Sequence, residues 1–116
     1  MQVQLPWMPK ELSPNSRVHY MKAAKIKAQY KLACFGFCKA ALQPFQGNVL
    51  LSITFHPPDK RKRDLDNMLA ALKAGLDGLS EAIGVNDYNF AITIRRGEPV
   101  QYGAVNIKVC PDEFAK

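Results

Sequence analysis

The spacing of apolar residues along this chain predicts four strands and two helices. Alternation of apolar and polar positions predicts strands at residues 2–5, 49–56, 88–96 and 104–110. Apolar residues spaced three and four apart predict helices from about 17 to 42 and from about 64 to 79. A chain of 116 residues is expected to form one α/β domain over residues 1–116, in the order βαβαββ. We expect a mixed sheet of about four strands packed against both helices, with the last two strands paired as a hairpin.

Each predicted helix has one apolar face. The stripe on the first helix is His19, Ala23, Ile26, Tyr30, Ala33, Phe37 and Ala41. The stripe on the second helix is Leu65, Met68, Leu69, Leu72, Leu76 and Leu79. The second helix also carries a stripe of small residues, Ala71, Ala74, Gly75 and Gly78. Small side chains allow another backbone to approach closely, so this stripe is expected to contact either the sheet or a second subunit.

Charge is distributed unevenly along the chain. The net charge is +6, but residues 1–63 carry +9 and residues 64–116 carry −3. This asymmetry predicts a basic surface that attracts a polyanion, next to a surface that collects carboxylates. A solvated basic helix without any partner is the alternative that charge alone leaves open.

Cysteine usage and hydropathy limit the class of protein. Cys34, Cys38 and Cys110 are an odd number and lack the spacing of a zinc site, so free thiols are expected. No apolar stretch approaches the roughly 20 residues of a membrane span, and the first ten residues lack the apolar segment of a secretion signal. We therefore expect no membrane partner and a location in the cytoplasm.

Four consecutive cations at residues 60–63 are followed directly by Asp64 and Asp66. At the entry to a helix, where the chain is still partly extended, both carboxylates can converge on a hard cation such as Mg²⁺. Asp87 precedes the third predicted strand. If that strand lies beside the one ending at His56, we expect Asp87 at the same end of the sheet. Helix capping by Asp64 or Asp66 and turn formation by Asp87 are the alternatives.

Acids and cations placed together in this way have the chemistry of phosphodiester hydrolysis. Carboxylate-bound Mg²⁺ activates water and neutralises charge in the transition state, while neighbouring cations bind phosphates. The cations also help to keep the acids ionised. Lys73 lies seven residues beyond Asp66 on the same helix face, where an exposed surface lysine is the default interpretation.

The segment 61–67, Arg-Lys-Arg-Asp-Leu-Asp-Asn, is followed by a helix rich in Ala and Leu and then by Gly-Val-Asn-Asp at 84–87. This arrangement resembles the RusA family of Holliday junction resolvases. Residues 5–7 and 12–19 are also similar to the opening loop of bacterial and phage members. The resemblance therefore covers nearly the whole chain.

The resemblance implies a homodimeric, Mg²⁺-dependent endodeoxyribonuclease, with Mn²⁺ as an alternative metal. Such an enzyme resolves four-way DNA junctions by paired nicks, in the cytoplasm of a bacterium or of a phage's host. Asp64 and Asp66 match the two acids of the family's Asp-Leu-Asp motif, and Asp87 matches its later acid. The chain departs from the family at Asn86, where a further acid is often found, and at Ala70, where a lysine is often found.

From the residues and the resemblance together, we assign Asp64, Asp66 and Asp87 to Mg²⁺. Lys73, one turn beyond Ala70, is assigned to the scissile phosphate or the leaving oxygen. The residues expected to bind DNA phosphates are Lys60, Arg61, Lys62, Arg63, Lys22 and Lys25.

Two other function classes are kept. A non-catalytic basic nucleic-acid-binding module, whose acids only cap a helix, accounts for the charge and for both departures. A basic subunit that binds another protein is the third possibility.

Overall fold

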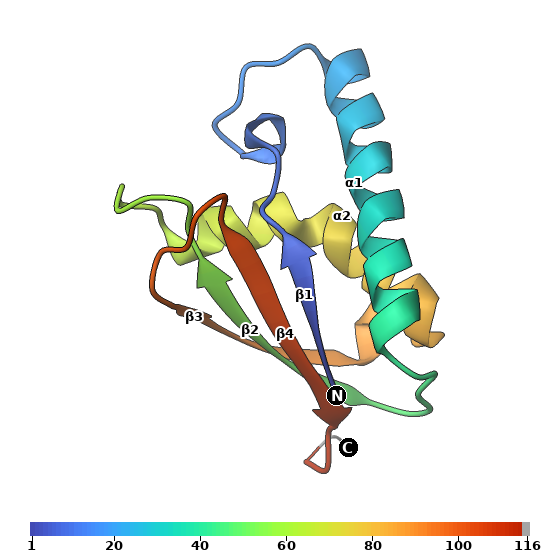
Figure 1. Cartoon of the computed structure of the whole chain (residues 1–116). Helices are drawn as coiled ribbons and strands as arrows, with labels where there is room; N and C mark the ends of the chain where they lie inside the picture. Colours follow the sequence, from blue (N-terminus) through green and yellow to red (C-terminus); the bar gives the residue numbers. More distant parts are fainter. Residues whose placement is uncertain (115–116) are drawn as a thin grey trace.

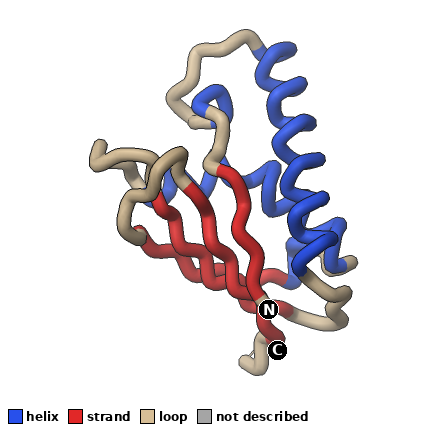
Figure 2. Tube along the Cα trace, viewed as in Figure 1, coloured by secondary structure: helices blue, strands red, loops and turns tan. Residues whose placement is uncertain are grey.

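The computed structural model describes residues 1–114 and places two helices against one face of a four-stranded sheet (Figures 1 and 2). The strands are β1 (Gln2–Pro6), β2 (Val49–His56), β3 (Phe90–Arg96) and β4 (Ala104–Pro111). The helices are α1 (Tyr20–Ala41) and α2 (Leu65–Ile83). Short 3₁₀ turns, η1 (Lys10–Leu12) and η2 (Asp87–Asn89), precede α1 and β3. The predicted α/β fold and element order are confirmed.

The order of the strands, β1-β4-β2-β3, corrects one prediction. β3 and β4 do not form a hairpin, because β2 lies between them, parallel to β3 and antiparallel to β4. Parallel neighbours cannot be joined by a tight turn, so the chain crosses from β2 to β3 through α2. The central position of β2 agrees with its alternation, since every second side chain is fully buried: Val49, Leu51, Ile53 and Phe55.

The small-residue stripe of α2 packs against α1. A Cβ added at Gly78 would lie 2.6 Å from the carbonyl oxygen of Lys31 and 2.9 Å from the amide nitrogen of Phe35. A Cβ at Gly75 would lie 3.0 Å from a ring carbon of Tyr30. The predicted close approach of another backbone is therefore present. At these two glycines the predicted neighbours, the sheet or a second subunit, are wrong, because the neighbour is α1 of the same chain.

The buried face of α1 agrees with the predicted stripe at Tyr30 and differs from it after that residue. Tyr30, Cys34 and Cys38 are buried, whereas Ala33 and Phe37 are exposed. The predicted stripe follows the apolar side chains of the sequence. In the structure, α1 instead faces α2 with residues that fit beside the α2 glycines, such as Tyr30 and Cys34 beside Gly75. All three cysteines are free, as predicted. Burial raises the pKa of the Cys34 thiol to about 11 and that of Cys38 to about 12, so both stay protonated at neutral pH.

Neither helix has the combination of length and apolar character that crossing a membrane requires, within residues 1–114.

Gly78→Ala is expected to destabilise the protein, because the new Cβ would force α1 and α2 apart. Overpacking of this kind costs about 1–3 kcal/mol, seen as a lower midpoint of urea unfolding. Gly36→Ala is the matched control, since its Cβ meets nothing within 4 Å. Alanine's helix preference is expected to stabilise α1 there by roughly 0.5–1 kcal/mol. Equal midpoints for the two variants would contradict this packing.

Candidate functional site

A groove of about 1030 Å³ lies between the N-terminal loop, the start of α1 and the loop that leads into α2. Apolar side chains in its lining are Trp7, Met8, Val18, Met68 and Ala71. Its cations are Lys10, Lys22, Arg61, Lys62 and Arg63, and its acids are Glu11, Asp59 and Asp64. The structure thus brings four of the six predicted phosphate-binding residues together with one predicted metal ligand. Lys25 and Lys60 are exposed and lie outside this lining.

Asp59 holds the basic loop that precedes α2. Its Oδ1 accepts hydrogen bonds from the Arg61 amide and from Nη1 of Arg63, both at 2.9 Å. The hydrogen bonds from Arg63 are the main reason why the pKa of Asp59 lies below its ordinary value. Arg96 of β3 donates from Nε and Nη2 to the Arg63 carbonyl oxygen, at 3.3 and 3.1 Å. The loop is therefore tied both to itself and to the sheet.

Arg63 serves mainly as an internal partner. Only 17% of its side chain is exposed, and its guanidinium lies 5.7 Å from the centroid of the Trp7 ring, within cation–π range. Pairing with Asp59 compensates its charge. Arg63 is therefore less accessible to a phosphate than the other cations that line the groove. The other cations of the groove lining, called the rim cations below, are Lys10, Lys22, Arg61 and Lys62. None of them makes an ion pair within residues 1–114.

Asp64 and Asp66 present free carboxylates at the start of α2. Asp64 occupies the N-cap position with φ −78° and ψ 138°, but its side chain makes no capping hydrogen bond. Asp66 lies in the first turn, and both residues are exposed. Neither carboxylate takes part in an ion pair within the described part of the chain. Helix capping by the Asp64 side chain therefore does not account for this residue.

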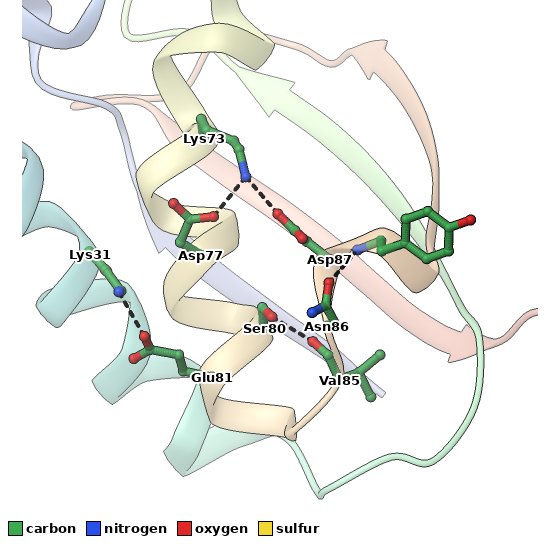
Figure 3. A network of polar contacts seen from close by, with 9 residues as sticks. Lys31, Lys73, Asp77, Ser80, Glu81, Val85, Asn86 and Asp87 are labelled. Atoms are coloured by element: carbon green, nitrogen blue, oxygen red, sulfur yellow. Dashed lines mark hydrogen bonds and ion pairs between the residues drawn. The ribbon is translucent and has the colours of Figure 1, made fainter.

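Asp87 forms an ion pair with Lys73, which it shares with Asp77. The Lys73 Nζ donates to Oδ1 of Asp77 and to Oδ2 of Asp87, each at 2.8 Å, so one ammonium lies between two carboxylates (Figure 3). The hydrogen bond from Lys73 lowers the pKa of Asp87 below its ordinary value. The hydrogen bonds to Asp77 and then Asp87 raise the pKa of Lys73. Asn86 accepts from the Tyr88 amide at 2.9 Å, which is the ordinary turn chemistry considered for this segment.

The expectation that Asp87 joins Asp64 at one end of the sheet is wrong, for a topological reason. β3 lies beside β2, but in parallel, with Phe90 opposite Val49. Asp87 therefore lies at the end where both strands begin, whereas Asp64 follows the end of β2 at His56. The predicted set of three aspartates is not assembled: within residues 1–114, no three or more His, Cys, Asp or Glu side chains are grouped to hold a metal ion.

Asp64 and Asp66 alone fit one part of a Mg²⁺ site. Proteins that act on phosphates often hold Mg²⁺ through one or two carboxylates, while water and substrate phosphates complete the octahedron. Asp87 does not fit such a site here, because the Lys73 ammonium already provides the cation beside it. Lys73 is held by two carboxylates, so it is not free to bind the scissile phosphate in this arrangement.

Two residues at these sites were not found from the sequence. Lys10 lines the groove, but a single cation in a proline-rich loop gives no pattern to detect. Asp77 follows Lys73 by four residues, and opposite charges at this spacing meet on a helix surface, so this partner was predictable.

Comparison with known proteins supplies one relative and no activity. No family model matches the chain. A stretch of 92 residues, 74% of this chain, is 39% identical to an uncharacterized protein of Xylella fastidiosa. The matched region covers 60% of that protein, so the match spans about three fifths of its relative's length.

Lys73→Met removes the ammonium shared by Asp77 and Asp87, so the pKa of Asp87 is expected to rise from its lowered value. A folded-state pKa below the unfolded one adds stability above the unfolded pKa, and this is lost as the pH falls through the folded pKa. The pair therefore favours the folded wild type at neutral pH but not in acid. Carboxyl NMR titration measures the shift.

Lys31→Met is the matched control for this titration. It removes a different ion pair, between Lys31 Nζ and Glu81 Oε1 at 2.7 Å, and is expected to leave the Asp87 titration where it is. The same Asp87 pKa in wild type and in Lys73→Met would contradict the bridging role of Lys73.

Proposed function

We propose that this protein is a Mg²⁺-dependent endonuclease that recognises branched DNA and cuts four-way junctions by paired nicks. One observation carries the proposal: within residues 1–114, Asp64 and Asp66 make no ion pair, and neither do Lys10, Lys22, Arg61 and Lys62 of the neighbouring groove. Free charges of both signs at one place favour a ligand that needs both, and DNA with a bound divalent cation is such a ligand. The resemblance of segment 61–67 to the RusA family supports the same function.

The residues of the groove have separate tasks in this proposal. Lys10, Lys22, Arg61 and Lys62 bind backbone phosphates and hold the DNA beside the start of α2. Asp64 and Asp66 hold Mg²⁺, which supplies an activated water and neutralises charge on the phosphate when it is bound. Asp59 and Arg63 keep the loop in shape, and the positive end of α2 favours the two carboxylates next to it.

Cleavage of a synthetic four-way junction tests the proposal. Wild type is expected to cut with Mg²⁺ and not with a chelator. Asp64→Asn and Asp66→Asn are each expected to lose at least a hundredfold in rate, because several kcal/mol of charge stabilisation are lost. Both variants are expected to stay folded and to lose no more than about 0.3–1 kcal/mol in urea unfolding, the contribution of one acid at a helix N-terminus.

Glu113→Gln, an exposed acid outside the groove lining, is the control and is expected to cut normally. Equal cleavage by wild type and both Asp variants would overturn the assignment.

A non-catalytic nucleic-acid-binding module is the second candidate. The observation that favours it is the Lys73 bridge, which holds Asp87 away from metal binding. Such a module binds the junction and leaves it uncut with either Mg²⁺ or Mn²⁺. The cleavage assay therefore separates the two candidates, whereas a binding assay does not.

Paired nicks across a branch point need two active sites, so we propose a homodimer. Gly75 and Gly78 of the small-residue stripe are not available for its interface, because α1 of the same chain packs against them. Light scattering at micromolar concentration is expected to give about twice the 13.0 kDa of one chain. A mass equal to that of one chain under these conditions would contradict the dimer.

A further inference from the structure

The face of the sheet turned away from both helices carries a polar hollow of about 610 Å³. Figure 1 shows α1 and α2 on the other face of the sheet. Within residues 1–114, no acidic residue and no Phe, Tyr or Trp lines this hollow. This surface is distinct from the groove at the start of α2, since the two linings share no residue.

The strand register builds the hollow from two parallel rows of side chains. In one row, Ser52 of β2 lies opposite Lys108 of β4 and Thr93 of β3. In the next row, Thr54 of β2 lies opposite Asn106 of β4 and Arg95 of β3. The rows are two residues apart along each strand, which is about 7 Å. Each row therefore offers one cation together with neutral hydrogen-bonding groups.

The two cations of the hollow are uncompensated. Arg95 and Lys108 are exposed, and neither makes an ion pair within the described residues. Positive charge among hydroxyl and amide groups, without an acid, is complementary to a chain of phosphates. Within residues 1–114, the one aromatic ring in the lining is the His56 imidazole, which Glu98 and Asn106 hold at its two nitrogens. The surface therefore offers little for base stacking and fits a nucleic-acid backbone rather than splayed bases.

His56 fixes one polar group of the hollow. Its Nδ1 lies 2.8 Å from the Glu98 carbonyl oxygen, so this nitrogen carries the proton and donates it. Its Nε2 then accepts from Nδ2 of Asn106 at 3.2 Å, which sets the orientation of the Asn106 amide. The loop after β3 closes on the imidazole at Gly97, where a Cβ would collide with the ring. The Asn106 amide is thus ordered before any ligand arrives.

We propose that this outer sheet face, centred on Arg95 and Lys108, is a second phosphodiester-binding surface that takes another arm of the DNA held in the groove. The identification of the ligand as branched DNA rests on the proposed function. The two surfaces meet at the end of β2, because His56 lines the hollow and Pro58 lines the groove. Two arms that diverge from one branch point can contact both surfaces at once, whereas one straight duplex is expected to contact only one of them.

Junction binding across a salt series, in a chelator so that no cutting occurs, tests this proposal. The variant is Arg95→Gln combined with Lys108→Gln. The control is Lys27→Gln combined with Lys39→Gln, which removes the same charge from exposed positions of α1. Loss of two phosphate contacts is expected to reduce the slope of log K against log salt by about 1.8, with a smaller change in the control. A slope and affinity equal to the control overturn the proposal.

A single duplex arm is the second substrate. The sheet-face variant is expected to lose less affinity for it than for the junction, and equal losses overturn the assignment to another arm. Amide NMR of the unmodified protein with the junction is expected to shift Ser52 and Thr93. Unshifted signals there, with shifts at Arg61, overturn the proposal without relying on any variant.

These measurements also separate the two proposals. In one outcome, the sheet-face variant binds the junction more weakly, but the wild-type protein does not cut it. This outcome supports the second surface and contradicts the endonuclease. In the other outcome, wild type cuts normally, and Arg61→Gln and Lys62→Gln lower binding whereas the sheet-face variant does not. This outcome supports the endonuclease and contradicts the second surface.

Discussion

The parallel pairing of β2 with β3 is the constraint from which the arrangement of charges follows. A parallel pair requires a crossover, so α2 runs back along the sheet from the end of β2 to the beginning of β3. Its first turn therefore lies beside the basic loop, while Asp87, at the entry to β3, meets the helix further along at Lys73. One helix thus separates two groups of acids, which an antiparallel arrangement would have brought to the same end.

These two groups differ in how their charge is compensated. Lys73 pairs with both Asp77 and Asp87 and compensates one of their two charges, while Arg63 pairs with Asp59. Exposed ion pairs of this kind contribute little to stability, so their effect lies mainly in positioning side chains and in limiting what else the charges can bind. Within residues 1–114, Asp64, Asp66 and the rim cations Lys10, Lys22, Arg61 and Lys62 have no such partner, so their charges are not compensated by an ion pair there.

The helices and strands were predictable from the sequence, whereas the question of which of them pack side by side was not. Alternation identifies the buried face of β2 correctly, but it carries no information on whether β3 or β4 lies at its side. The stripe containing Gly75 and Gly78 correctly indicated a close backbone contact, yet small side chains do not specify which backbone approaches. The sequence predicts the basic surface beside Asp64, because runs of charge are visible in a sequence, but it does not predict the groove. The separation of Asp87 from Asp64 was not predictable from the sequence, because it depends on the parallel direction of β2 and β3.

The contact at Gly78 has a consequence for how this protein varies among its relatives. A side chain at this position would meet main-chain atoms of α1, which no compensating side-chain substitution can remove. Gly36, in open space on α1, is under no such restriction. Wherever evolution keeps the two helices at this distance, glycine should persist at the first position and drift at the second, providing a signature for homologues too diverged to be recognised by overall identity.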